Sequence, residues 1–254
     1  MSEDFYLKIL YIPIIFTFIT MKNALITGAT KGMGRAIAIA FAKENINLAV
    51  CARNASDLEA FKAELYTINP DIAVVTVTAD GSNREELLNF AEIAQQKLGQ
   101  IHIIVNSLGM YAQSSILDDE KNLFLKVVNT NLMPSYELYR FFGKSMVSVG
   151  EGHIFNICSI AALDPIPEAG IYSVTKAALL CLNDVMRLEM KQYGVKVTAV
   201  IPGSTLTDSW KGITVDKDKM VLPEDIASAI INIYKMSAGA NVDQIIIKPV
   251  YGQV

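Results

Sequence analysis

The segment 171–180, IYSVTKAALL, places Tyr172 and Lys176 four positions apart at the start of an apolar run. Residues at this spacing share one face of a helix, so the lysine ammonium would lie beside the phenol. A nearby cation favours the phenolate and lowers a tyrosine pKa that is ordinarily near 10. Such a phenol could exchange a proton with a reacting oxygen. The same pair is also typical of an ordinary exposed helix, and other residues must separate the two interpretations.

Ser159 is the first of those residues. It ends the apolar run 153–159, whose composition is typical of a buried strand, and open α/β sheets bind ligands at such strand ends. Hydride transfer to a carbonyl builds negative charge on its oxygen, which then needs a proton donor and hydrogen bonds. Tyr172 and Ser159 together therefore indicate carbonyl or alcohol chemistry.

A glycine-rich turn precedes these residues, in TGATKGMG over 27–34. Gly28, Gly32 and Gly34 follow a first apolar run and open a helical segment. Without Cβ atoms the backbone can approach a pyrophosphate, which then lies at the helix N-terminus. An ordinary strand–helix loop is the alternative. The position after the first strand of an alternating pattern favours a dinucleotide site.

Two cationic residues indicate whether the dinucleotide is NAD(H) or NADP(H). Arg53 lies where an NAD site carries an acidic residue, and Lys31 lies within the glycine turn. The first carboxylate after Arg53 is Asp57. Cations without a repelling acid favour the extra phosphate of NADP(H), whereas a solvated loop arginine is the alternative.

Apolar runs alternate with segments of helical period from Asn23 onward. The expected strands are continuously apolar and cover 23–27, 46–52, 72–78, 101–106, 153–159, 195–201 and 244–248. The expected helices cover 33–44, 55–68, 83–98, 120–148, 171–193 and 223–236. This alternation predicts one α/β domain over 21–254, a doubly wound parallel sheet of about seven strands with helices on both faces.

The composition excludes several other classes of protein. A net charge of −4, without a local Lys/Arg cluster, does not favour nucleic acid as a partner. The three cysteines, Cys51, Cys158 and Cys181, are widely separated and odd in number, which suits a reducing cytoplasm. His102 and His153 begin separate apolar runs, so no metal site is expected.

Residues 1–20 form an apolar segment with an uncharged run from Ile9 to Thr20. A helix over this run would span about 18 Å, short of the roughly 30 Å of a bilayer core. We interpret 1–20 as an extension outside the functional fold, as a start codon placed too early would produce, with Met21 as the natural start. A peripheral membrane anchor is the alternative.

Seven motifs in order resemble those of the short-chain dehydrogenase/reductase family. They cover about 22–254 and comprise TGATKGMG (27–34), AD (79–80), VNSLG (105–109), Asn131 in VNTNL, Ser159 in NICSIAA, YSVTK (172–176) and IPGSTLT (201–207). The resemblance implies a Rossmann fold. It also implies that Tyr172 is the general acid/base, that Lys176 tunes it and binds the nicotinamide ribose, that Ser159 holds the substrate oxygen, and that Asn131 supports a relay water.

The resemblance extends the NADP(H) site along the chain. Asp80 would meet the adenine, Asn106 would line the cofactor, and Ile201 and Thr207 would hold the nicotinamide amide. Leu108 stands where the family has alanine and is expected to narrow the turn. The full cofactor set is Thr27, Gly28, Thr30, Lys31, Gly32, Met33, Gly34, Arg53, Asp80, Gly81, Asn106, Gly109, Tyr172, Lys176, Pro202, Gly203 and Thr207.

The substrate loop is expected over 203–222, where the single tryptophan, Trp210, could stack on a flat substrate ring beside Ser159 and Tyr172. Packing of Trp210 onto the core is the alternative. The stretches PGSTLTDSW (202–210), LPEDIA (222–227) and DQIIIKPVYGQV (243–254) resemble the C-terminal half of bacterial sepiapterin reductases, which implies reduction of a pterin side-chain carbonyl. A 3-oxoacyl-carrier-protein or 3-hydroxyacid substrate, and a regulatory NADP-binding protein without catalysis, are the alternatives. The family also implies a homodimer or homotetramer through the helices at 120–148 and 171–193.

Overall fold

The computed structural model describes residues 21–119, 122–210, 212 and 214–253. The predicted extension over 1–20 and the first residues of the helix expected at 120–148 lie outside the described residues. Within the described ranges, every helix is too short or too polar to cross a bilayer.

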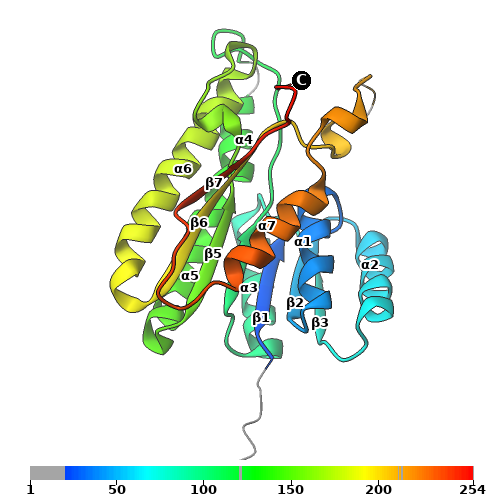
Figure 1. The fold of residues 1–254 in the computed structure, drawn as a ribbon, viewed down its shortest axis with the longest axis vertical. Coiled ribbons are helices and arrows are strands. Elements are labelled where there is room, and N and C mark those ends of the chain that lie inside the picture. Colours follow the sequence, from blue (N-terminus) through cyan, green and yellow to red (C-terminus); the bar gives the residue numbers. More distant parts are fainter. Residues whose placement is uncertain (1–20, 120–121, 211, 213, 254) are drawn as a thin grey trace, which may run out of the picture.

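Seven parallel strands form one twisted sheet in the order β3-β2-β1-β4-β5-β6-β7 (Figure 1). Their bounds are β1 (Asn23–Thr27), β2 (Asn47–Ala52), β3 (Val74–Thr78), β4 (Ile103–Asn106), β5 (Gly152–Ile157), β6 (Val195–Pro202) and β7 (Gln244–Ile247). The strand order confirms the predicted doubly wound class. It also explains the continuously apolar runs, because every residue of β1, β4 and β5 is buried between two helical layers.

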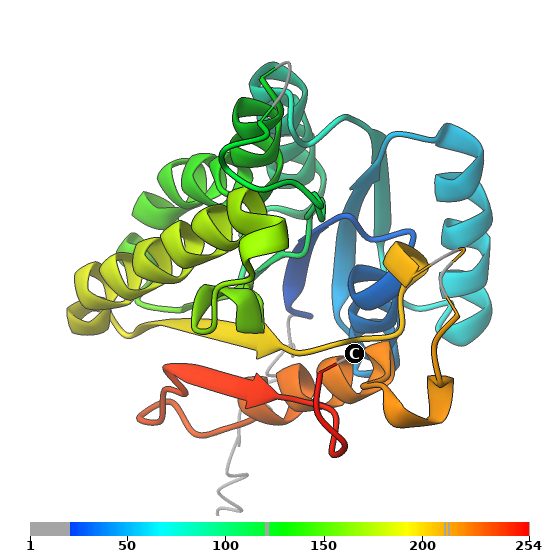
Figure 2. The same ribbon diagram turned by 90° about the horizontal axis from the view of Figure 1, so that it is seen from above.

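Helices cover both faces of the sheet (Figure 2). Helices α1 (Gly32–Lys43), α2 (Ala55–Ile68) and α7 (Pro223–Tyr234) share one hydrophobic core with the strands, and α3 (Arg84–Leu98), α5 (Met133–Val149) and α6 (Gly170–Met190) share the other. Helix α4 (Leu123–Asn131) packs against α5 and α6. Local signals set some helix starts: the Asn83 side chain accepts from the amides of Glu85 and Glu86, and Asp225 accepts from that of Leu222.

One helix of the prediction is wrong in its extent. The segment expected as a single helix over 120–148 forms α4 and α5, separated at Leu132. Pro134 lies in the first turn of α5. Proline has no amide hydrogen for an intrahelical bond and its ring crowds the preceding turn, so a continuous helix through this point is disfavoured.

The strand order reverses beside β1. Strands β3 and β4 follow one another in the chain but lie on opposite sides of β1 in the sheet. The helices that leave β1 and β4 therefore diverge to opposite faces and leave a crevice at the carboxyl ends of these strands. The predicted glycine turn and Asn106 lie at those ends.

Candidate active site and cofactor cavity

The turn between β1 and α1 can be formed only with glycine at several points. Gly28 and Gly32 have φ of +65° and +52°, in the region that favours glycine. A Cβ on Gly34 would lie 2.3 Å from the carbonyl oxygen of Gly28. The N-cap residue of α1, Lys31, makes no side-chain cap, so the first amides of the helix face outward without a partner from that side chain. This geometry suits a pyrophosphate.

A cavity of about 990 Å³ lies against this turn and reaches across the crevice. Its volume is at the upper end of the range for ligand sites, as a dinucleotide requires. Most of the predicted cofactor residues line it: Gly28, Thr30, Lys31, Gly32, Met33, Arg53, Asp80, Gly81, Gly109 and Thr207.

Two predicted cofactor residues support the cavity from outside. The Thr27 hydroxyl accepts from the amides of Ser107 and Leu108 at 3.1 and 3.2 Å, which joins the glycine turn to the loop after β4. The Asn106 amide donates to Asn156 Oδ1 at 2.8 Å and is buried. The side chain of Asn106 thus lies between β5 and α5, since its amide also donates to the Ser135 hydroxyl at 3.2 Å. The expected contact of Asn106 with the cofactor stays a prediction.

Two further predicted residues, Pro202 and Gly203, lie at the end of β6 beside the C-terminal tail. The Gly203 amide donates to the Ile247 carbonyl at 2.8 Å. A Cβ on Gly203 would lie 2.5 Å from Nε2 of Gln253. The side-chain oxygen of Gln253, Oε1, in turn accepts from the backbone amide of Ser204 at 2.7 Å. The two residues therefore anchor the start of the 203–222 loop rather than line the cavity.

One end of the cavity is cationic. Lys31 and Arg53 line it, and Lys31 Nζ lies 3.9 Å from Asp57 Oδ2 with both side chains largely exposed, an ion pair of little strength. Lys126 of α4 also lines the cavity and was not predicted. Partial burial acts to raise the pKa of Asp80, but hydrogen bonds from Ser82 and the charges of Arg53 and Lys126 lower it overall. The region thus favours an anionic ligand.

Leu108, the large residue expected to narrow the turn, lines the cavity and packs beside Gly81. Its Cδ2 atom lies 2.8 Å from the point where a Cβ on Gly81 would be. Leu108 and Gly81 both line the cavity next to Asp80. The large residue at 108 and the absent side chain at 81 are therefore complementary in volume.

The catalytic candidates converge at the start of α6. Lys176 is buried, and its Nζ donates to the Ile157 carbonyl at 2.8 Å and lies 5.8 Å from the centre of the Tyr172 ring. Ser159 follows β5 and makes a hydrogen-bonding contact with Tyr172. Gly109 of the loop after β4 also lies close to this group, since a Cβ on Gly109 would be 3.5 Å from Lys176 Nζ. The predicted group of Tyr172, Lys176 and Ser159 is therefore assembled in space.

The expected lowering of the Tyr172 pKa is wrong in this structure. Burial raises the pKa of Tyr172 to about 12, and the hydrogen bond with Ser159 only partly opposes it. Burial also lowers the pKa of Lys176 to about 8. Loss of solvation disfavours the charged form of both groups, and this effect exceeds the attraction that helical spacing alone suggested. Tyr172 is consequently a neutral phenol, and a proton donor, at neutral pH.

Asn131 joins three elements around this group. Its Nδ2 donates to the Met110 carbonyl at 3.1 Å and to the Thr175 hydroxyl at 3.2 Å, and its Oδ1 accepts from the Met110 amide at 2.7 Å. It therefore connects α4, the loop after β4 and α6. The relay water on Asn131 stays a prediction, since none of these contacts tests it.

Tyr111 is a site residue that the sequence prediction missed. Its ring meets that of Tyr172 edge to face, with centroids 5.2 Å apart, and it also lines the cofactor cavity. Half of its surface is exposed, at 50%. An aromatic residue just after Gly109 in a loop that leaves a strand end was the available signal.

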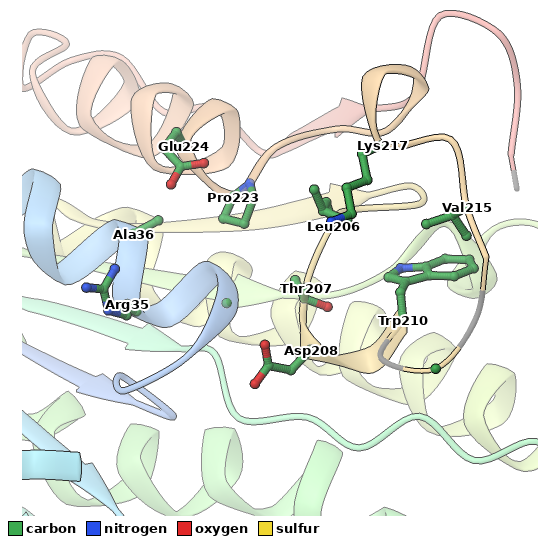
Figure 3. A pocket seen from close by; sticks show the side chains of 12 residues that line it. Arg35, Ala36, Leu206, Thr207, Asp208, Trp210, Val215, Lys217, Pro223 and Glu224 are labelled. Atoms are coloured by element: carbon green, nitrogen blue, oxygen red, sulfur yellow. The ribbon is translucent and has the colours of Figure 1, made fainter.

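Trp210 lies elsewhere (Figure 3). It lines a second cavity of about 510 Å³ between the 203–222 loop and the first turns of α1 and α7, and its indole extends toward Val215 and Lys217. Its Nε1 donates to the Thr205 carbonyl at 2.9 Å. The two cavities share Gly32, Thr207 and Asp208. The structure thus does not bring Trp210 together with Tyr172.

Comparison with known proteins agrees with this geometry. A family model described as short chain dehydrogenase matches residues 22–218. An uncharacterized oxidoreductase of Staphylococcus aureus is 30% identical over 92% of this chain and 100% of its own length.

Two solved structures have the same fold. An alcohol dehydrogenase of the archaeon Thermococcus sibiricus, complexed with 5-hydroxy-NADP, has a TM-score of 0.84 at 26% identity and covers 92% of this chain and 99% of its own. The L-sorbose reductase of Gluconobacter frateurii, complexed with NADPH and L-sorbose, has a TM-score of 0.84 at 25% identity and covers 91% and 96%. The motifs, the fold and the family match agree, and this chain belongs to the short-chain dehydrogenase family of oxidoreductases.

Proposed function

We propose that the protein is an NADP(H)-dependent carbonyl reductase with Tyr172 as general acid. When bound, NADPH supplies a hydride to the carbonyl carbon. Tyr172 donates its phenolic proton to the carbonyl oxygen, so that an alcohol and NADP⁺ are formed. Ser159 holds the same oxygen by a hydrogen bond. The convergence of Tyr172, Ser159 and Lys176 at the cavity edge supports this proposal most directly.

The choice of cofactor is supported by charge and by relatives. Lys31, Arg53 and Lys126 line the cavity, and the charges of Arg53 and Lys126 both lower the pKa of Asp80, so the 2′-phosphate that distinguishes NADP from NAD would find cationic donors there. The Thermococcus sibiricus and Gluconobacter frateurii enzymes are complexed with 5-hydroxy-NADP and NADPH. Both considerations favour NADP(H).

The raised pKa of Tyr172 favours reduction over oxidation at neutral pH. A phenol with a pKa of about 12 carries the proton that a developing alkoxide needs. Removal of a proton from an alcohol would require the phenolate, which is scarce at pH 7. We therefore expect faster turnover of carbonyls than of alcohols under neutral conditions.

A pterin side-chain carbonyl, as in sepiapterin, remains a specific candidate substrate within this class. Tyr111, rather than Trp210, is the aromatic side chain beside Tyr172 and could stack on such a ring. A 3-oxoacyl or 3-hydroxyacid compound is the other candidate.

NADPH oxidation across a panel of carbonyls, sepiapterin included, tests the proposal. We expect Tyr172→Phe to lower kcat/KM by roughly 100-fold or more, while the Kd for NADPH stays within about twofold. Equal activity of the variant and the wild type would refute the mechanism. Tight NADPH binding without turnover of any carbonyl would instead favour a regulatory protein.

A further inference from the structure

Two segments with exposed apolar side chains flank the catalytic tyrosine. The loop after β4 carries Tyr111, Ile116 and Leu117, and the segment after β5 carries Leu163 and Ile166. These large apolar side chains are exposed to solvent, whereas the strands β1, β4 and β5 are fully buried between the two helical layers. We call the two segments, 110–119 and 159–170, the substrate rim.

Packing and hydrogen-bond contacts attach the substrate rim to the first turns of α6. A Cβ on Gly170 would lie 3.1 Å from Ile116 Cγ1, so Ile116 packs directly over the start of α6. The Ile166 amide donates to the Ser173 hydroxyl at 3.0 Å. With the edge-to-face contact of Tyr111 and Tyr172, both segments adjoin the helical turn that holds the catalytic phenol.

Several apolar side chains of the substrate rim are highly exposed. Leu117 is 97% exposed, Ile116 63% and Leu163 46%. Contiguous apolar surface on a soluble protein marks a binding site more often than isolated apolar residues do. Because Tyr111 contacts Tyr172 and also lines the cofactor cavity, a group attached to the reacting carbonyl would lie against the substrate rim.

The charges of the substrate rim have one sign. The ionisable carboxylates of 110–119 and 159–170 are Asp118, Asp119, Asp164 and Glu168, all exposed, and these described segments contain no lysine or arginine. An anionic substrate would approach four carboxylates. An acyl-carrier protein, whose surface is acidic, would face the same repulsion.

We infer that the substrate is a neutral ketone or aldehyde with an aliphatic or aromatic group beside the carbonyl, not a carboxylate, a phosphate or an acyl-carrier thioester. This inference rests on the proposed function and specifies its substrate class. The reaction stays a two-electron reduction in which hydride from NADPH reaches the carbonyl carbon and the proton of Tyr172 reaches the oxygen.

The test uses matched pairs of substrates with the full chain. We expect kcat/KM to rise about three- to fourfold for each methylene added to a 3-oxo methyl ester series, and to be at least about tenfold lower for the free acid than for its ester. The double variant Asp164→Asn/Glu168→Gln should narrow the gap between acid and ester, and so should added salt. Val149→Ser, an exposed apolar position at the end of α5, should leave the gap unchanged.

The outcomes separate this inference from the function on which it rests. If acids are reduced as well as esters, or if kcat/KM is independent of chain length, the inference is overturned while carbonyl reduction stands. If no carbonyl is reduced although NADPH binds, the proposed function itself fails. Thermal unfolding of each variant shows whether an altered rate reflects a folded protein.

Discussion

The glycine turn over 27–34, here called the cofactor turn, and the substrate rim lie at the same edge of the sheet. The turn presents backbone atoms to a ligand, whereas the rim presents side chains. The turn consists of backbone held by contacts that leave no room for a Cβ, as at Gly34. The rim consists of exposed side chains on two loops, such as Leu117 and Leu163. Under the proposed function, the cofactor would meet fixed backbone, whereas the substrate would meet side chains that can change without disturbing the fold.

The largest effect on stability is expected at Lys176, the buried lysine beside Tyr172. Burial lowers its pKa from 10.5 to about 8. Between these values the unfolded chain binds a proton at this lysine that the folded chain lacks, so the contribution of Lys176 to the free energy of unfolding rises with pH across this window, by up to about 3 kcal/mol. The contribution is fully present above pH 10.5 and is lost as pH falls to 8.

Urea denaturation between pH 7 and pH 9 measures this dependence, because above pH 9 the burial that raises the pKa of the Cys51 and Cys158 thiols lowers the free energy of unfolding as pH rises. Lys176→Met should remove the rise, and Lys196→Met, on a lysine of β6 whose Nζ donates to the Ser237 carbonyl, should keep it. A Lys176→Met protein with the same pH profile as the wild type would show that the lysine is not desolvated as the structure indicates.

The next effect tests the cationic end of the cofactor cavity. Arg53→Ala should weaken NADPH by roughly 10- to 100-fold, the range for loss of a charge-assisted hydrogen bond, and should leave NADH nearly unchanged. Fluorescence titration with both nucleotides measures the two Kd values. Equal losses for NADPH and NADH would mean that Arg53 does not face the 2′-phosphate. The same titration of Lys126→Ala would assign a role to the cation that the sequence did not reveal.

A smaller effect is expected where Gly81 packs against Leu108 in the lining of the cofactor cavity. Gly81→Ala places a Cβ 2.8 Å from Leu108 Cδ2, the end of a side chain that can turn aside, and should cost about 1 kcal/mol or less in NADPH binding or in unfolding. Leu108→Ala should relieve most of that cost when the two are combined. Simple additivity in the double-mutant cycle would argue against direct contact.

The smallest effect belongs to the substrate rim. Leu163→Ser should change the free energy of unfolding by no more than about 0.5 kcal/mol, because the side chain is already exposed. Chemical denaturation measures it. A loss of several kcal/mol in the free energy of unfolding would contradict this expectation, because Leu163 would then contribute to the hydrophobic core.

The same difference explains what could be predicted from the sequence. The glycine turn, the doubly wound class of the sheet and the Tyr172–Lys176 pair follow from glycine spacing, apolar periodicity and helical geometry, which can be read along the chain. The sequence left two positions open for Trp210, because its direction depends on a hydrogen bond to Thr205 within a loop. Tyr111 and Lys126 were missed because their roles arise only once β4 and α4 lie beside the cavity.

The pKa of Tyr172 could not be derived from spacing either. The four-residue separation from Lys176 indicates a nearby cation but carries no information on solvent exclusion. Helix α6 packs against β6 and the turn after β5, and the resulting burial outweighs the local charge. Burial is a property of the whole fold, so the sign of this shift required the structure.

The strand order has a consequence for how the chain reaches its native state. Strand β1 is formed by the first described residues, yet it is paired on one side by β4, whose residues come roughly 80 positions later. The amides of Ser107 and Leu108, just beyond β4, also complete the cofactor turn through Thr27. During synthesis, the apolar strands β1 to β3 therefore precede the partner that closes them. A chain with this topology should refold slowly and aggregate if released early, so that co-translational chaperone capture would protect it.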